Sequence, residues 1–223
     1  FIQGWLDAVK FLWLSLLFLS QAVLATCPAG NSQHECEAVR IQPLVTPEQK
    51  KDALTQLQKF QQALSAKNAT KLKTFLKFPY DTYFGFLAEI ELPESEPFTE
   101  ALFDRHSETI MRRLHNVTKF TIHPGTQWID DYLSHSLTPA EQKRKYYPLN
   151  DGRFYYEEKG ERHYVTGICE LAMSGNISDD GITLNIGSQA NEQIPPAVCD
   201  GTTILEFGMI NGQLKLLRVS FAG

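Results

Sequence analysis

The densest group of side chains that could bind a metal or move a proton lies near the middle of the sequence. His123, Asp130, Asp131 and His135 follow one another closely there, and imidazole and carboxylate groups can coordinate zinc or act as general acids and bases. The alternative is a polar loop whose charges are solvated around Trp128. Because neighbours such as Asp130 and Asp131 point in different directions in most local structures, we favour the loop. We therefore assign no metal ligand and no catalytic residue.

The cysteines of the chain are Cys27, Cys36, Cys169 and Cys199. An even number of cysteines in an exported chain is typical of disulfides, and four cysteines allow three pairings. We favour Cys27–Cys36 together with Cys169–Cys199, because this pairing closes the most local loops. Structural zinc sites use closely spaced cysteine pairs, and the sequence has no two cysteines separated by two residues. The spacing therefore favours two disulfides over a zinc site.

The first 25 residues have the order of charged, apolar and small residues that is typical of a secretory signal. Lys10 precedes an apolar run over 11–19, and small residues suit cleavage after Ala25. The run is about half as long as the ~20 residues that span a membrane. We therefore expect a periplasmic or secreted protein that has no membrane contact after cleavage. Two alternatives stay open, an uncleaved N-terminal anchor and a lipoprotein attached at Cys27.

The composition is that of an ordinary globular protein. Of the 223 residues, 43% are hydrophobic and 21% are charged, and the formal net charge is -5. Nucleic-acid-binding proteins normally carry a surplus of basic residues, so we expect no nucleic-acid partner. One segment superficially suggests phosphate and base-stacking contacts with a nucleic acid, because two tyrosines follow Lys143, Arg144 and Lys145. The expected organisation is a signal peptide over 1–25, a disulfide-bonded tail over 26–45 and a single domain over 46–223.

Helices are predicted in the first half of this domain. Thr46 and Gln49 can form a capping box around Pro47, and apolar residues at spacings of three and four then predict a helix over 47–66. Similar patterns predict helices over 68–78 and 98–114, and a short one that starts after Thr138. Residues 83–92 are rich in aromatic and β-favouring residues, which predicts a strand.

The second half of the domain has the pattern of strands. Residues 153–159 and 161–173 flank Gly160 and are predicted to pair as a hairpin, and 182–186 predicts a short strand. Residues 203–210 and 213–221 flank Asn211 and Gly212, a pair suited to a two-residue turn. Within the predicted strand 161–173, His163 and Glu170 lie on opposite faces. The order of elements predicts an α+β fold in which N-terminal helices pack on a curved, mostly antiparallel sheet.

This order of elements resembles the NTF2-like superfamily of cone-shaped α+β domains. Residues 60–80, 98–114 and 204–221 carry the resemblance, which covers most of 46–221. It implies a sheet that curls around a cone, with the long helix packed inside and a ligand pocket at the mouth. The polar and aromatic residues that we expect near this mouth are Asp81, Tyr83, Trp128, Asp130, Tyr155 and His163.

Two functions of different classes fit these observations, since the superfamily hosts both enzymes and binding domains. The first is an exported, non-catalytic domain that binds a protein or a small ligand, for instance as an inhibitor or immunity-type protein. The second is a small-molecule enzyme, an isomerase, dehydratase or hydrolase, that uses carboxylate or histidine acid–base chemistry. We favour the first, because the sequence carries no serine-hydrolase, zinc-protease, P-loop or dinucleotide-binding motif. No cofactor is implied, and a homodimer is one oligomer that we consider.

Overall fold

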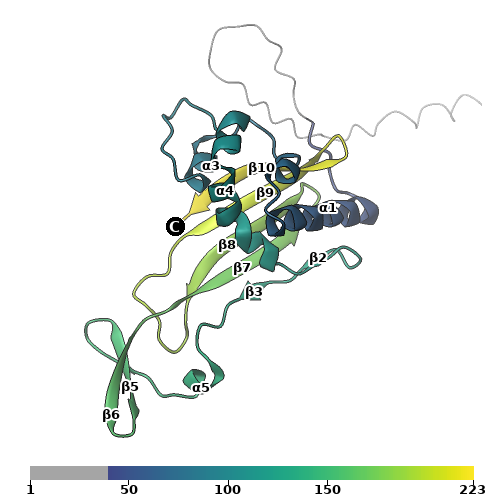
Figure 1. The fold of residues 1–223 in the computed structure, drawn as a ribbon. Coiled ribbons are helices and arrows are strands. Elements are labelled where there is room, and N and C mark those ends of the chain that lie inside the picture. Colours follow the sequence, from purple (N-terminus) through teal and green to yellow (C-terminus); the bar gives the residue numbers. More distant parts are fainter. Residues whose placement is uncertain (1–39) are drawn as a thin grey trace, which may run out of the picture. The chain divides into compact units, whose positions relative to one another are not determined.

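Helices from the first half of the chain pack on one face of an antiparallel sheet built by the second half (Figure 1). The computed structural model describes residues 40–223, and Gln42–Gly223 form one unit. The predicted α+β fold is confirmed. The unit starts before residue 46, because the backbone N–H of Gln42 donates to the Met209 carbonyl and buried Leu44 donates to Asp179.

The first helix begins where the sequence predicts. Helix α1 spans Pro47–Ser65, and Thr46 and Gln49 form the expected capping box. Its buried face packs into the core, where the Phe60 ring lies 5.2 Å from Phe207 and 5.6 Å from Phe75, measured between centroids. These edge-on contacts join the helix to the sheet and to the segment that follows it.

Four further α-helices and one 3-10 helix complete the helical part of the described structure. They are α2 (Ala69–Lys73), α3 (Thr82–Leu87), α4 (Glu100–Leu114), the 3-10 helix η1 (His115–Lys119) and α5 (Pro139–Gln142). The predicted helix 68–78 is therefore shorter than expected, while Thr138 caps α5 through a second capping box.

The predicted strand at residues 83–92 is wrong, because these residues begin within helix α3 and continue into a turn. The Asp81 carboxylate caps the helix by accepting a hydrogen bond from the backbone N–H of Tyr83. Phe84, Leu87 and Ala88 are buried, which is the spacing of one helical face. Helical burial of these side chains therefore outweighs the strand preference of aromatic residues.

Two sheets carry most of the strands in the described structure. The main sheet has the order β10-β9-β8-β7-β3, and the small sheet has the order β4-β5-β6, with antiparallel pairing throughout. The strands of the main sheet are β3 (Tyr132–Leu133), β7 (Cys169–Ile177), β8 (Ile182–Ala190), β9 (Thr202–Ile210) and β10 (Gln213–Ala222). Those of the small sheet are β4 (Tyr147–Pro148), β5 (Arg153–Glu158) and β6 (Glu161–Thr166), and β1 (Ile122–His123) pairs with β2 (Trp128–Ile129).

The turn between β9 and β10 is the one that the sequence predicts. Asn211 and Gly212 have φ angles of 50° and 74°, and two positive φ values are the requirement of the tight turn that suits twisted strands. The predicted strand 182–186 also exists, but β8 continues to Ala190.

The single strand predicted over 161–173 is wrong, because the chain leaves the small sheet after Thr166 and enters the main sheet at Cys169. Gly167 lies so close to Pro196 that an added Cβ would be 2.4 Å from the Pro196 Cα. Ile168 donates to the Ile194 carbonyl and accepts a hydrogen bond from the Asn191 backbone. The neighbouring loop, rather than a partner strand, therefore satisfies the backbone at the crossing.

A buried tyrosine gives the first testable prediction. The Tyr80 hydroxyl donates to the Leu216 carbonyl and accepts from the Lys77 backbone N–H, so Tyr80→Phe leaves one buried and one half-buried backbone group without this partner. We expect the free energy of unfolding to fall by about 1–3 kcal/mol, as measured by urea denaturation. Tyr83→Phe is the matched control, because that ring is 55% exposed, and its change should stay within about 0.5 kcal/mol. Equal effects of the two variants would contradict the role of the Tyr80 hydroxyl.

Candidate functional site

The structure places the predicted pocket residues in three separate places. Asp81 and Tyr83 belong to the start of α3, Trp128 and Asp130 to β2 and the residue after it, and Tyr155 and His163 to the small sheet. These six residues therefore do not line one common pocket, as the sequence led us to expect. Each place has its own contacts.

Asp81 has a structural role that its position explains, since its carboxylate caps α3. Tyr83 lies on the outer side of the same helix, beside the exposed ring of Phe86, which contacts Phe221 at 5.9 Å between centroids. These residues form an exposed aromatic surface on α3 and the end of β10.

His123 and Asp130 form a hydrogen-bonded pair on the β1–β2 hairpin. His123 Nε2 lies 2.9 Å from Asp130 Oδ2, and both side chains are about half exposed. Trp128 is the register partner of His123 and is 60% exposed. Of the four side chains that could bind a metal, only His123 and Asp130 are thus in contact with each other. Within residues 40–223, no group of three or more His, Cys, Asp or Glu side chains is placed to hold a metal ion. The pair could exchange a proton with a bound molecule, but a solvated hairpin gives it no low-dielectric surroundings.

The small sheet carries a row of stacked tyrosines on one face. Tyr147, Tyr155 and Tyr164 are register partners across β4, β5 and β6. The Tyr147 and Tyr155 rings stack with centroids 5.0 Å apart, and Tyr164 lies 6.4 Å from Tyr155 in a tilted arrangement. Tyr164, in the last strand of the row, is 57% exposed. The row is thus a surface feature rather than a core.

Each ring of this row has a cation above it. Lys145 Nζ lies 5.1 Å from the Tyr147 centroid, the Arg162 guanidinium 4.7 Å from Tyr155, and the Arg153 guanidinium 5.5 Å from Tyr164. Distances below about 6 Å are those of cation–π attraction. We call these side chains together the tyrosine–cation face; its members are Lys145, Tyr147, Arg153, Tyr155, Arg162 and Tyr164.

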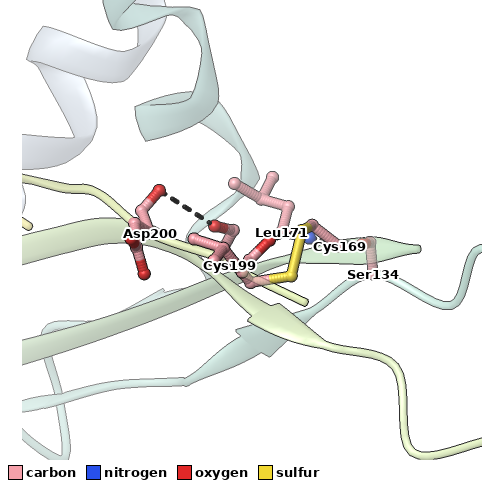
Figure 2. Close-up of a disulfide and its surroundings, with 7 residues drawn as sticks. Ser134, Cys169, Leu171, Cys199 and Asp200 are labelled. Atoms are coloured by element: carbon pink, nitrogen blue, oxygen red, sulfur yellow. Dashed lines mark hydrogen bonds between the residues drawn. A yellow bond between two sulfur atoms is a disulfide. The ribbon is translucent and has the colours of Figure 1, made fainter. Parts of the chain in front are cut away.

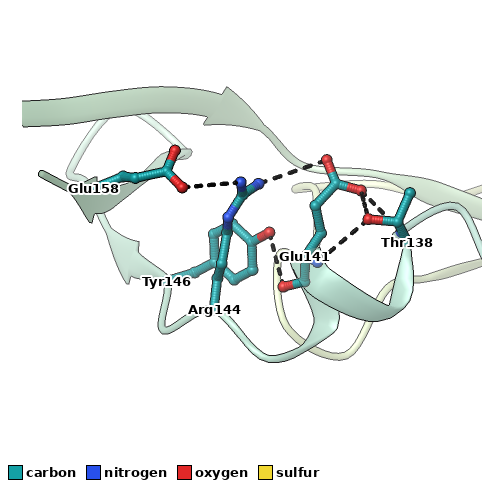
Figure 3. Close-up of polar contacts among 5 residues, drawn as sticks. All are labelled: Thr138, Glu141, Arg144, Tyr146 and Glu158. Carbon is teal, nitrogen blue, oxygen red and sulfur yellow. Dashed lines mark hydrogen bonds and ion pairs between the residues drawn. The ribbon is translucent and has the colours of Figure 1, made fainter.

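The opposite face of the small sheet is anchored by Arg144 (Figure 3). Its guanidinium lies 4.3 Å from the Tyr156 centroid and pairs with Glu141 and Glu158 at 3.7 Å each. The Tyr146 hydroxyl donates to the Glu141 carbonyl at 3.1 Å. Arg144 thus connects the end of α5 with β5.

His163 lies on this second face, away from the tyrosine–cation face. Its ring stacks on Tyr156 with centroids 5.0 Å apart. Glu170 is in the main sheet, is only 5% exposed, and accepts hydrogen bonds from the Ser136 backbone and the Asn191 side chain. His163 and Glu170 therefore take part in two unrelated sets of contacts, and Glu170 holds loops together.

The predicted disulfide between Cys169 and Cys199 is confirmed (Figure 2). It joins the first residue of β7 to the segment before β9, next to Asp200, whose backbone carbonyl accepts from the Ser188 hydroxyl at 3.5 Å. On the other side, Leu171 donates to the Ser134 hydroxyl at 2.8 Å. The bond therefore fixes the place where the chain enters the main sheet. Cys27 and Cys36, like the predicted signal peptide, lie outside the described residues.

A groove of about 430 Å³ opens over β3, β7 and β8. Asn185 donates to the Ser174 hydroxyl within its lining. Asp131 is the only member of the His123–His135 group that lines it, and none of the six predicted pocket residues does. The lining residues are Asp131, Tyr132, Leu133, Ala172, Met173, Ser174, Asn185, Gly187, Ser188, Gln189 and Thr202.

Comparison with known proteins gives no relative whose functional site could be compared with these residues. No family model, curated protein or solved structure matches the chain. The resemblance to NTF2-like domains therefore stays a prediction. In the described part of the chain, no helix combines the length and the apolar character that a membrane span requires.

The carboxylates around the small sheet predict a pH dependence. Hydrogen bonds from the Thr138 hydroxyl and backbone lower the pKa of Glu141, and the Arg153 guanidinium lowers the pKa of Asp151. A carboxylate whose pKa is lower in the folded state contributes stability above its unfolded pKa and loses it as the pH falls. We therefore expect amide-exchange protection in α5 and at the start of β5 to decrease below about pH 4, before protection in β8 and β9 decreases.

Glu141→Gln tests this cause, because the amide keeps the shape of the side chain and does not titrate. The variant should show a smaller change in protection between neutral and acidic pH than the wild type. Glu192→Gln is the control, since Glu192 is exposed in a loop outside the small sheet. An unchanged pH dependence in Glu141→Gln would contradict the assignment to Glu141.

Proposed function

We propose that the chain is an exported binding domain that recognises a protein partner through the tyrosine–cation face. The observation that carries the proposal is the row of three tyrosines, each with a cation above its ring, on an open face of the small sheet. Tyrosine and arginine are the residues that most often dominate the energy of protein–protein contacts. Residues of this face line none of the described grooves, and a small ligand normally needs a concave site.

The packing of this face supports the proposal because it reduces the entropy lost on binding. Tyr147 and Tyr155 are already stacked, and Arg162 is held over Tyr155 while it pairs with Glu157 at 3.4 Å. Ordering a free side chain at an interface costs about 0.5–1.5 kcal/mol. Side chains that are ordered before contact lose less freedom when a partner binds.

The charge of the small sheet indicates the kind of partner. Residues 143–166 contain six basic and four acidic side chains, although the whole chain has a net charge of -5. Arg153 pairs with Asp151 in the turn before β5 and Arg162 pairs with Glu157 in β5, whereas within the described residues Lys145 has no ion pair. Complementary charge increases the rate and selectivity of association. We therefore infer that the partner presents carboxylates to this face.

Export is the second part of the proposal. Disulfides persist mainly in oxidising compartments, and Cys169–Cys199 is such a bond. The apolar run over 11–19 and the small residues before Thr26 are the sequence features that support a secretory signal. Together they favour a periplasmic or secreted location.

The intact mass of the protein from its native host tests the export. We expect a mature chain that begins at Thr26 and is about 4 Da lighter than its fully reduced form, because each of two disulfides removes two hydrogens. A chain that retains residues 1–25, or thiols that react after denaturation without reductant, would contradict export with two disulfides.

A photo-reactive benzophenone side chain in place of Tyr164 tests the binding face. In cells of the native host, light should produce an adduct between this variant and another protein, because Tyr164 lies on the proposed surface. The same group in place of Tyr83 is the matched control, since the two tyrosines have similar exposures of 57% and 55%. Adducts of equal yield from both positions, or adducts from position 83 alone, would overturn the proposed face.

A further inference from the structure

The outer edge of β6 differs from the outer edges of the main sheet. On β10, the Leu216 backbone donates to the Phe75 carbonyl and its carbonyl accepts from the Tyr80 hydroxyl. At the other end of the main sheet, the edge strand β3 has only two residues, Tyr132 and Leu133, and offers little backbone for pairing. Within residues 40–223, β6 pairs only with β5. An uncovered edge strand is a template for pairing with another chain.

The turn that precedes β6 determines which of its backbone groups point outward. Lys159 and Gly160 have φ angles of 53° and 82° and connect the register pair Glu158–Glu161. Such a two-residue turn is closed by a hydrogen bond between the residues that flank it, and hydrogen-bonded and non-hydrogen-bonded pairs then alternate along the strands. The backbone N–H and C=O groups that point away from β5 are therefore those of Arg162, Tyr164 and Thr166.

We propose that a second copy of this chain pairs with this edge, so that two β6 strands lie antiparallel about a two-fold axis beside Tyr164. The two small sheets then form one six-stranded sheet. In this register Tyr164 lies opposite the partner's Tyr164, and Arg162 lies opposite the partner's Thr166. The outward backbone groups of both strands meet in hydrogen-bonded pairs.

Charge and side-chain pairing favour this register over one that keeps the same kind of hydrogen bonds but opposes two arginines. A shift that places Arg162 opposite the partner's Arg162 puts two guanidinium groups side by side, which is unfavourable across strands. In the proposed register no like charges are opposed, and His163 lies opposite the partner's Val165 on the second face. The row of Tyr147, Tyr155 and Tyr164 continues into the same row of the partner, and aromatic cross-strand pairs stabilise sheets.

This dimer goes beyond the proposed binding function, because a monomer could also present the tyrosine–cation face to a partner. Pairing would double the length of that face and place the two copies of Tyr164 at its centre. The contact between two six-residue strands is small compared with the ~1,200 Å² of stable interfaces. The dimer should therefore be reversible and depend on protein concentration.

Cysteine cross-linking of the full chain tests both the interface and its register. Residues in a hydrogen-bonded antiparallel pair have Cα atoms about 5.5 Å apart, within the range that a disulfide spans. Under mild oxidation, Tyr164→Cys should give a covalent dimer, and so should an equal mixture of Arg162→Cys and Thr166→Cys. Thr166→Cys alone should give little, because it does not face itself. If Thr166→Cys alone gave as much covalent dimer as Tyr164→Cys, the proposed register would be overturned.

Sedimentation of chains without added cysteines tests the pairing of the backbone. The wild type should shift from monomer to dimer as its concentration rises. Thr166→Pro removes one outward N–H and should abolish the shift, whereas Thr166→Ala should keep it. A wild type that is monomeric throughout, or a Thr166→Pro variant that still dimerises, would overturn the proposal.

These results are distinguishable from those on the proposed function. A dimer without an adduct to another protein at position 164 would leave the interface intact and contradict the binding role. A monomer that forms such an adduct would contradict the dimer and support the binding role. The other protein would then be the molecule that occupies the β6 edge or the tyrosine–cation face.

Discussion

The crossing at Gly167 and Ile168 is the constraint on which the arrangement of both sheets depends. No side chain larger than that of glycine fits against Pro196 at this point, and Ile168 makes its backbone hydrogen bonds with the loop at Asn191 and Ile194. Because the strand stops here, β6 and β7 belong to different sheets. The disulfide at Cys169 and the buried carboxylate of Glu170 then fix the residues that follow.

The small sheet lies outside the main core and is stabilised in another way. The main sheet buries Phe207, Leu205 and other apolar residues against the helices. In the small sheet, stacked rings and cations take the place of an apolar layer, with Arg144 in contact with Tyr156 and paired with Glu158. Aromatic and cation–π contacts each contribute about 0.5–1.5 kcal/mol, so the sheet depends on several of them together. The same side chains that stabilise it are the ones that it presents to solvent.

Local signals in the sequence predicted the elements, while the candidate site needed the pairing of strands. The capping boxes at Thr46 and Thr138 and the turn at Asn211 are visible because the residues that make them are adjacent in sequence. Tyr155 is among the residues expected near a pocket, but its place in a row with Tyr147 and Tyr164 follows from the strand register, which the local residue pattern does not reveal. The strand predicted from residue 83 failed because buried side chains at helical spacing outweighed the local preference of aromatic residues.

The disulfide also has a topological consequence for a chain that meets proteases. The bond between Cys169 and Cys199 closes a covalent ring that contains β8 and the exposed residues around Val198. A single cut of the backbone between Asn191 and Val198 opens this ring without separating the two fragments. Until the bond is reduced, a chain nicked there keeps β9 and β10 tethered to the rest of the molecule.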